Sequence, residues 1–261
     1  MDAVTPDPHR AVEYAPAKLT LSLRITGRRA DGLHLIDAEM ISLDLVDTLE
    51  FGIGHGLVVV DDVAGHGSPL VVATGPDNLV HRALAAVGRR ADVRLTKRIP
   101  AGAGLGGGSA DAAAVLRWAG LHGYTADELA VAARLGADVP FCLRGGRARV
   151  TGIGEVIEER PCQSAVPFTL LTPPLAVSTA EAYRAWDEMG GPTADGPNDL
   201  ESAALAVEPR LAEWRDRLGD ASGQEPVLAG SGSTWWVPGA YPDVAGAVVV
   251  RSACPPQRAA R

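Results

Sequence analysis

Five glycines lie within residues 102–108, in the stretch IPAGAGLGGGSADAAAVL at residues 99–116. Glycine loses more conformational entropy on folding than other residues, so such a cluster needs a reason. Backbone N–H groups without a neighbouring Cβ can approach an anion, and a following helix N-terminus adds partial positive charge. Ser109 adds a hydroxyl for a phosphate or its metal ion. The chemistry on offer is phosphate binding, and the alternative is a flexible turn before a capped helix.

Neither standard phosphate-binding motif accounts for this stretch. Residues 102–107 satisfy G-x-G-x-x-G, but a dinucleotide-binding unit needs a second parallel strand that ends in an acidic residue soon afterwards. The sequence TADELAVAARLG at 125–136 predicts another helix there. A Walker loop requires Lys followed by Ser or Thr where Ser109-Ala110 stands. The physics shared by both motifs still applies, although Asp111 would repel a phosphate unless a cation lay between them.

Two charged residues elsewhere could serve the same chemistry. Lys18 lies on the polar face of an expected strand, and Asp138 stands between the helix-ending Gly136 and Pro140. Taken separately, Lys18 fits a solvated lysine and Asp138 fits a turn aspartate. Combined with an anion cradle, a lysine and a carboxylate are the groups that phosphoryl transfer to an alcohol uses.

Hydrophobic periodicity predicts the strands that must position these residues. Residues 17–25 (AKLTLSLRI) alternate strictly, which predicts a half-buried strand with Lys18 and Thr20 on its polar face. Residues 92–99 predict a strand that leads into the glycines. A helix should follow from about Ala110, with Ser109 as its expected cap.

Further elements divide the chain into two parts. Residues 147–159 predict a hairpin, and residues 226–237 predict a strand, a glycine loop and a strand. Other helices are expected behind an Asp77 cap, from Thr125, from Ser178, from Asn198 and at Pro209. The polar, proline-bearing segment 160–167 predicts a linker. We therefore expect two mixed α/β domains, residues 1–159 and 160–261, that meet across a cleft.

Composition limits the class of protein. A hydrophobic content of 46% with 21% charged residues is ordinary for a soluble globular protein. The N-terminal MDAVTPDPHR lacks the features of a signal peptide, and no apolar run approaches the roughly 18 residues of a membrane span. Cys142, Cys162 and Cys254 show no paired spacing, which favours reduced thiols over disulfides or zinc. We expect a cytoplasmic protein that does not bind membranes.

The charge balance argues against a general nucleic-acid binder. The formal net charge is −8, although a local basic pocket could still form. Its candidates are Arg24, Arg28, Arg29, Lys97 and Arg98, and most of them fit solvated surface charges equally well.

An ordered set of motifs resembles the GHMP kinases. In chain order these are APAKLTLSL, TGRRADGLHLI, DNLVHRA, IPAGAGLGGGSADAAAVL, LGADVPF, PNDLE and LAGSGST, which cover the chain nearly end to end. The resemblance is greatest to members that phosphorylate the 2-hydroxyl of a cytidine-diphosphate-linked methylerythritol in non-mevalonate isoprenoid biosynthesis. It implies an α+β fold in which a ribosomal-protein-S5-like N-terminal domain faces a ferredoxin-like C-terminal domain.

The resemblance also implies site residues, a nucleotide and a metal. Asp138 matches the catalytic aspartate and Lys18 the catalytic lysine. The residues matching the ATP-phosphate loop are Pro100, Ala101, Gly102, Ala103, Gly104, Leu105, Gly106, Gly107, Gly108, Ser109 and Ala110. The residues matching the substrate side are Thr20, Leu33, His34, Tyr183, Gly230, Ser231 and Gly232, with Tyr183 stacked on the cytosine and His34 beside it. ATP and Mg²⁺ are implied, with Ser109 a candidate metal ligand. Assembly stays open between monomer and homodimer.

Three positions depart from the family pattern and keep other readings open. Leu33 replaces a Tyr that would cover one face of cytosine, Thr20 replaces Asn, and Ala110 replaces a second Ser. Leu33 and Thr20 favour a GHMP kinase for another small alcohol of mevalonate, homoserine or sugar type, whereas His34 and Tyr183 oppose it. A catalytically silent member that binds nucleotide or a protein partner is opposed by Lys18, Asp138 and the intact loop. Trp235-Trp236 fits either a core pair or a surface patch.

Overall fold

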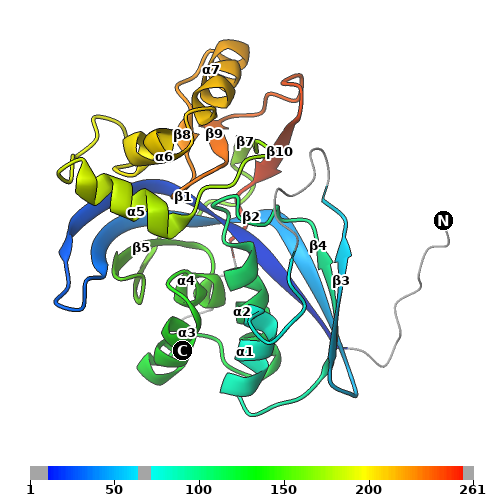
Figure 1. Ribbon diagram of the computed structural model, residues 1–261. Helices are drawn as coiled ribbons and strands as arrows, with labels where there is room; N and C mark the ends of the chain where they lie inside the picture. The colour runs from blue at the N-terminus through cyan, green and yellow to red at the C-terminus, as the bar shows by residue number, and fades with distance from the viewer. Residues whose placement is uncertain (1–10, 64–71, 255–261) are drawn as a thin grey trace.

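The structure, a computed structural model, describes residues 11–63 and 72–254. The prediction about a signal peptide concerns residues 1–10 and lies outside them. The first sheet has the strand order β3-β4-β2-β5-β6, with β1 paired to β2 (Figure 1). Its strands are β1 (Ala11–Arg28), β2 (His34–Gly52), β3 (Gly56–Asp61), β4 (Asp92–Lys97), β5 (Arg147–Gly152) and β6 (Val156–Arg160). β3 and β4 are parallel, and the other neighbours are antiparallel.

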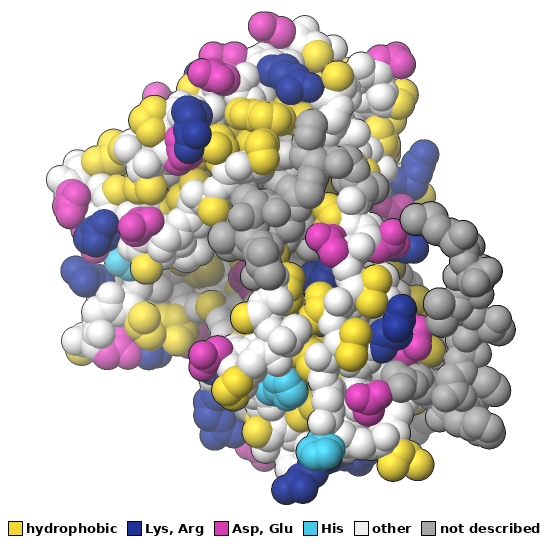
Figure 2. All heavy atoms as spheres, turned by 45° about the vertical axis from the view of Figure 1, so that its right-hand side comes forward, with side chains coloured by type: hydrophobic (Ala, Val, Ile, Leu, Met, Phe, Trp, Pro, Cys, Tyr) yellow, Lys and Arg dark blue, Asp and Glu magenta, His cyan; other side chains and the backbone are white. Residues whose placement is uncertain are grey.

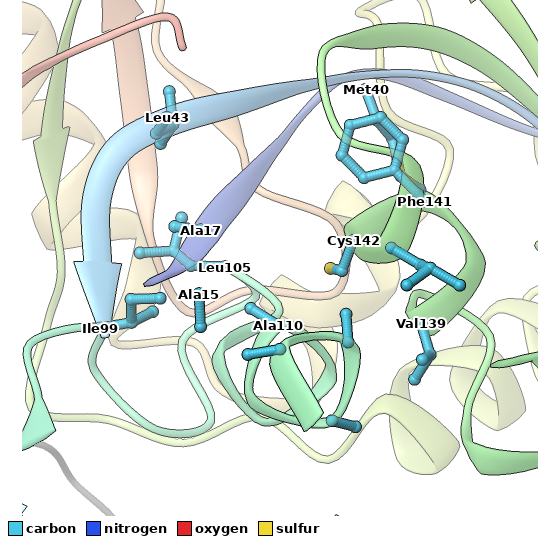
Figure 3. Packing of buried hydrophobic residues seen from close by; sticks show 14 of the residues in the cluster. Ala15, Ala17, Met40, Leu43, Ile99, Leu105, Ala110, Val139, Phe141 and Cys142 are labelled. Atoms are coloured by element: carbon cyan, nitrogen blue, oxygen red, sulfur yellow. The ribbon is translucent and has the colours of Figure 1, made fainter. Parts of the chain in front are cut away.

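Four helices accompany this sheet: α1 (Leu79–Ala86), α2 (Gly107–Trp118), α3 (Ala126–Leu135) and α4 (Val139–Arg144). α2 and α4 pack against its strands, and α1 and α3 pack against the other helices. The central one is α2, which contacts β1, β2 and the three other helices. Its alanine-rich sequence lets it approach the sheet closely, and Figure 3 shows Ala110 beside Ala15, Ala17 and Leu105. The helix that begins in the glycine stretch is therefore fixed by the core beneath it.

The second sheet has the antiparallel order β10-β7-β9-β8. Its strands are β7 (Pro167–Leu171), β8 (Val227–Leu228), β9 (Trp235–Pro238) and β10 (Ala247–Arg251), accompanied by α5 (Thr179–Glu188), α6 (Glu201–Val207) and α7 (Leu211–Ser222). Trp235 and Trp236 are both buried, which identifies the tryptophan pair as core. Phe168 and Val250 of this sheet join the core of the first sheet, so one buried cluster spans both.

Several helix boundaries differ from the sequence-based predictions. Thr125 and Ser178 cap α3 and α5 as predicted. The cap of α1 is Asn78 rather than Asp77, because the Asn78 carboxamide accepts from the Val80 N–H at 2.8 Å. The cap of α2 is Gly106 rather than Ser109, so this helix starts earlier than Ala110. α6 and α7 are capped by Leu200 and Arg210, so Asn198 and Pro209 lie just outside these helices.

The prediction of a half-buried first strand is wrong where it matters most. Lys18 and Thr20 on the polar face are only 5% and 2% exposed, as buried as Leu19 between them. β-bulges interrupt the pairing with β2 between Pro16 and Lys18 and between Thr20 and Ser22. The polar face of this stretch is buried because both glycine loops pack over it, so Lys18 is not a solvated lysine.

The cysteines also depart from expectation. Cys162 and Cys254 form a disulfide with a Cα–Cα distance of 5.8 Å, across a sequence separation of 92 residues. The antiparallel pairing of β7 with β10 brings together the segments that flank them, which linear spacing does not reveal. Cys142 is a free, buried cysteine. Among the described residues, none of the helices combines the length and apolar character needed to span a lipid bilayer.

We expect the native protein to be inert to a thiol reagent at pH 8. The thiolate is the reactive form, and burial raises the pKa of the Cys142 thiol, with a further rise from the Asp138 charge. Denaturation without reductant should expose this one thiol, and denaturation with reductant should expose all 3 cysteines. Titration with a chromogenic disulfide reagent measures the number of reactive thiols in each of these three states. Three thiols in the denatured, unreduced protein would mean that Cys162 and Cys254 are not bonded.

Candidate active site

A cleft of about 800 Å³ lies between the two parts of the chain. Figure 2 shows the surface hollowed there, with basic and acidic side chains beside one another over the rest of this face. The predicted site residues that line it are Lys18, Thr20, Leu33, His34, Pro100, Ala101, Gly102, Ala103, Gly104, Gly106, Gly107, Gly108, Ser109, Asp138, Tyr183, Gly230, Ser231 and Gly232. Leu105 and Ala110 do not line the cleft, because their side chains lie in the core and are each 1% exposed (Figure 3).

The glycine stretch forms a loop between β4 and α2 that ends in the helix N-terminus. Gly106 caps the helix with φ +69°, and a Cβ there would lie 2.7 Å from Cγ of Lys18. The backbone N–H of Lys18 donates to the Leu105 carbonyl at 3.0 Å, which ties the loop to β1. The first N–H groups of a helix have no intrahelical acceptor, so Gly107 and Gly108 offer theirs at the cleft. This arrangement suits an anion.

A buried ionic cluster supports the loop from below. Asp47 of β2 accepts hydrogen bonds from the Lys97 ammonium and from the backbone N–H groups of Arg98, at 2.6 Å, and Ile99, at 2.8 Å. Lys97 also donates to Asp111 of α2 at 2.8 Å. One lysine therefore joins β2, the end of β4 and α2 on both sides of the glycine loop.

Lys97 is also the cation that is needed to offset the charge of Asp111, which would otherwise repel a phosphate bound at the loop. Burial raises the pKa of Asp111 to about 7, against the opposing attraction of Lys97. Burial also acts to lower the pKa of Lys97, but Asp111 and Asp47 outweigh it and the pKa is raised. Because Lys97 stays charged, the negative charge of Asp111 is offset beneath the loop.

Lys18 and Asp138 meet at the floor of the cleft. Nζ of Lys18 lies 3.4 Å from Oδ2 of Asp138 and donates to the Thr20 hydroxyl at 3.1 Å. The Lys18 side chain is 6% exposed and that of Asp138 is 31% exposed. Asp138 is the N-cap residue of α4, but its carboxylate makes no capping bond. The result is a buried ammonium beside a carboxylate that opens to the cleft.

A second glycine loop, Gly230–Gly232, faces the first. A Cβ on Gly230 would lie 3.3 Å from Nζ of Lys18, and one on Gly104 would lie 2.1 Å from the Ala229 carbonyl. The loops therefore touch through their backbones, and Lys18 is packed between them. The Thr179 hydroxyl also lies 2.9 Å from the Ser231 hydroxyl, which links this loop to α5.

Sequence reasoning treated PNDLE as a helix start and missed what Asn198 and Asp199 do. Both are 1% exposed. The Asn198 amide donates to the carbonyls of Leu228, at 2.9 Å, and Gly230, at 2.7 Å, which holds the second glycine loop. Asp199 accepts from the Arg24 guanidinium at 2.7 Å and ties this segment to β1. Two adjacent polar residues in one motif were the signal that could have found them.

Two aromatic side chains, His34 and Tyr183, also line the cleft. The His34 ring stacks on Tyr183 with centroids 4.7 Å apart and meets Trp186 edge-on at 5.7 Å. Burial raises the pKa of Tyr183 to about 12, helped by the charge of Asp138, so this residue stays a neutral phenol. Because His34 covers one face of Tyr183, a base stacked on Tyr183 must use the other. Leu33 is 47% exposed at the rim.

The candidate basic pocket does not form, because each of its five members faces a carboxylate. The pairs are Arg24–Asp199, Arg28–Asp187, Arg29–Asp31, Lys97 with Asp47 and Asp111, and Arg98–Asp62. Of these members only Lys97 lines the cleft, and it is fully engaged beneath the loop.

Comparison with known proteins is consistent with this geometry. Residues 78–146 match the GHMP kinases N terminal domain. The chain is 38% identical over 242 residues to 4-diphosphocytidyl-2-C-methyl-D-erythritol kinase from Ruegeria pomeroyi, covering 85% of this chain and 86% of the relative. It is 35% identical over 269 residues to the enzyme of the same name from Granulibacter bethesdensis, covering 90% and 87%.

Solved structures share the α+β fold and confirm that expectation. A crystal structure of 4-(cytidine 5'-diphospho)-2C-methyl-D-erythritol kinase matches with a TM-score of 0.71 and 33% identity, over 93% of this chain and 99% of that one. Mevalonate kinase from L. major matches with a TM-score of 0.62 but only 12% identity, over 97% and 99%. The second likeness is one of fold alone.

Proposed function

Because the chain belongs to the 4-diphosphocytidyl-2-C-methyl-D-erythritol kinase family of GHMP kinases, we propose that it transfers the γ-phosphoryl group of ATP to the 2-hydroxyl of 4-diphosphocytidyl-2-C-methyl-D-erythritol. The observation that carries this proposal is that one cleft is lined by an anion cradle, the Lys18–Asp138 pair and the aromatic side chains of His34 and Tyr183. A substrate with a hydroxyl near one end and a base at the other fits such a cleft.

Asp138 and Lys18 perform the transfer in this proposal. Asp138 accepts a hydrogen bond from the attacking hydroxyl and takes its proton as the bond to phosphorus forms and the bond to the leaving oxygen breaks. Phosphoryl transfer passes through a loose transition state, so orientation and charge matter more than a strong base. Lys18, held by Thr20, offsets charge on the transferred group and on Asp138.

The glycine loop and a magnesium ion complete the proposed site. The N–H groups of Gly107, Gly108 and Ser109 bind phosphate oxygens, as a helix N-terminus does elsewhere. Mg²⁺ prefers oxygen ligands and is usually held by one or two protein groups together with substrate phosphates. Among the described residues no cluster of three or more acidic, His or Cys ligands is present, which suits that mode. Ser109 would hold the ion, which neutralises phosphate charge when bound.

Other features remain proposals. The division at residues 159 and 160 and an assembly of one or two copies rest on the sequence arguments. A cytoplasmic location rests on them too, but without the cysteine argument, which the Cys162–Cys254 disulfide removes. The shared core of the two sheets supports a fixed arrangement of the two parts.

A panel of acceptor alcohols tests the substrate proposal. With ATP and Mg²⁺, we expect ADP release to be fastest with 4-diphosphocytidyl-2-C-methyl-D-erythritol, and at least about 100-fold slower with mevalonate or homoserine. The reason is that remote binding energy from the cytidine end is needed for orientation at the reacting hydroxyl. Faster turnover of either competitor would overturn the substrate and leave the kinase fold intact.

A further inference from the structure

Asp187 of α5 contacts His34, which lines the cleft with Tyr183, but is not itself among the residues that line the cleft. Its Oδ1 lies 2.8 Å from Nε2 of His34, and its Oδ2 lies 3.6 Å from Nη1 of Arg28. The Arg28 Nε–H in turn donates to the Gly32 carbonyl at 2.9 Å. The carboxylate is thus held from two sides and joins the tip of the β1–β2 hairpin to α5.

This contact decides which nitrogen of His34 carries a hydrogen. A carboxylate only accepts hydrogen bonds, so Nε2 must donate. In a neutral imidazole Nδ1 is then the acceptor. His34 is 11% exposed and is fixed by the stack on Tyr183 and the edge contact with Trp186. A ring held in this way presents a defined acceptor to a ligand in the cleft.

We propose that Asp187 is a positioning residue that keeps the hydrogen of His34 on Nε2 and leaves Nδ1 as an acceptor. Through this acceptor the site selects a pyrimidine with an exocyclic amino group, as in cytosine, over one with a carbonyl oxygen in its place, as in uracil. An acceptor at Nδ1 can pair with the exocyclic amino group of cytosine. At the same placement uracil offers a carbonyl oxygen, and two acceptors facing each other repel. The inference rests on the proposed function, because it assumes that a pyrimidine binds beside His34.

The selection should be lost when the carboxylate becomes an amide. In Asp187→Asn the side chain can present either its oxygen or its NH₂ group to Nε2, so either nitrogen of His34 can carry the hydrogen. The matched control is Glu188→Gln, which removes the same charge one residue away. Glu188 pairs only loosely with Arg184, at 3.8 Å, and is 71% exposed.

Binding of CDP and UDP at pH 8, measured by calorimetry, is the first readout. We expect the unmodified protein and Glu188→Gln to bind CDP at least about ten-fold more tightly than UDP, since an unmatched polar pair in a binding site is costly. In Asp187→Asn the ratio should fall below about three-fold. With the full substrate, the change should raise KM by about five-fold or more and lower kcat by less than about three-fold, because Asp187 pairs with His34 and Arg28 and does not line the cleft.

A spectroscopic readout leaves Asp187 unchanged. Long-range ¹H–¹⁵N spectra of the His34 ring in the unmodified protein, assigned with His34→Gln, report which nitrogen is protonated. Hydrogen on Nε2 with Nδ1 unprotonated supports the inference, and hydrogen on Nδ1 overturns it. Equal binding of CDP and UDP by the unmodified protein would instead contradict the proposed pyrimidine site. A strong CDP preference retained in Asp187→Asn would overturn the role of Asp187 while leaving the proposed function in place.

Discussion

Replacing Asp138 with Asn should lower kcat by about 10² to 10⁴, the usual cost of removing a general base. The amide keeps the shape of the side chain but neither carries a negative charge nor accepts a proton. Lys18 retains its hydrogen bond to Thr20 at 3.1 Å, so its ammonium should stay in place. Because the glycine loop is untouched, the Kd for ATP should change by less than about three-fold. Steady-state kinetics and nucleotide binding measure the two effects separately.

Asp127→Asn is the matched control for this change. Asp127 is exposed in the first turn of α3 and does not line the cleft. Its loss should leave kcat within about two-fold of the unmodified protein. If Asp138→Asn also stayed within a few-fold, Asp138 would be a turn aspartate that merely begins α4, and another group would have to orient the hydroxyl.

Much of the candidate site could be predicted because its parts are local. The glycine stretch indicates a loop and the start of a helix within 18 residues. Periodicity correctly placed Lys18 and Thr20 on one face of a strand. The burial of that face could not be predicted, since it depends on contacts with residues 104–106 and 230, far along the chain. Pairing across such distances leaves no local pattern.

The residues that were missed share this cause. Asn198 and Asp199 act through carbonyls and side chains of segments that the motif itself does not contain. Asp187 contacts a histidine 153 positions earlier in the chain. The Cys162–Cys254 disulfide likewise depends on the pairing of β7 with β10. The three cysteines show no paired spacing, and this favoured reduced thiols over a disulfide. Linear spacing, however, carries no information about which strands become neighbours.

Gly104→Ala should reduce kcat by about 10²-fold or more, because the two glycine loops touch at this residue. A Cβ at position 104 would lie 2.1 Å from the Ala229 carbonyl oxygen and 2.8 Å from that of Gly232. Both are backbone atoms, so the loops must move apart rather than a side chain turn aside. A displacement near 1 Å at groups that orient substrates costs on the order of 10² in rate. Lys18, packed between the loops, would move with them.

Gly88→Ala separates this steric effect from backbone strain. Gly88 has φ +63° and Gly104 has φ +77°, so both variants place a Cβ in the left-handed region. A Cβ on Gly88 would meet nothing within 4 Å. Each variant should lose about 1–3 kcal/mol of unfolding free energy through strain, measured by denaturant titration. Only Gly104→Ala should also lose activity while still folded, because only there does the added methyl group force the first glycine loop away from the second. Full activity in folded Gly104→Ala would show that contact between the loops is not needed for phosphoryl transfer.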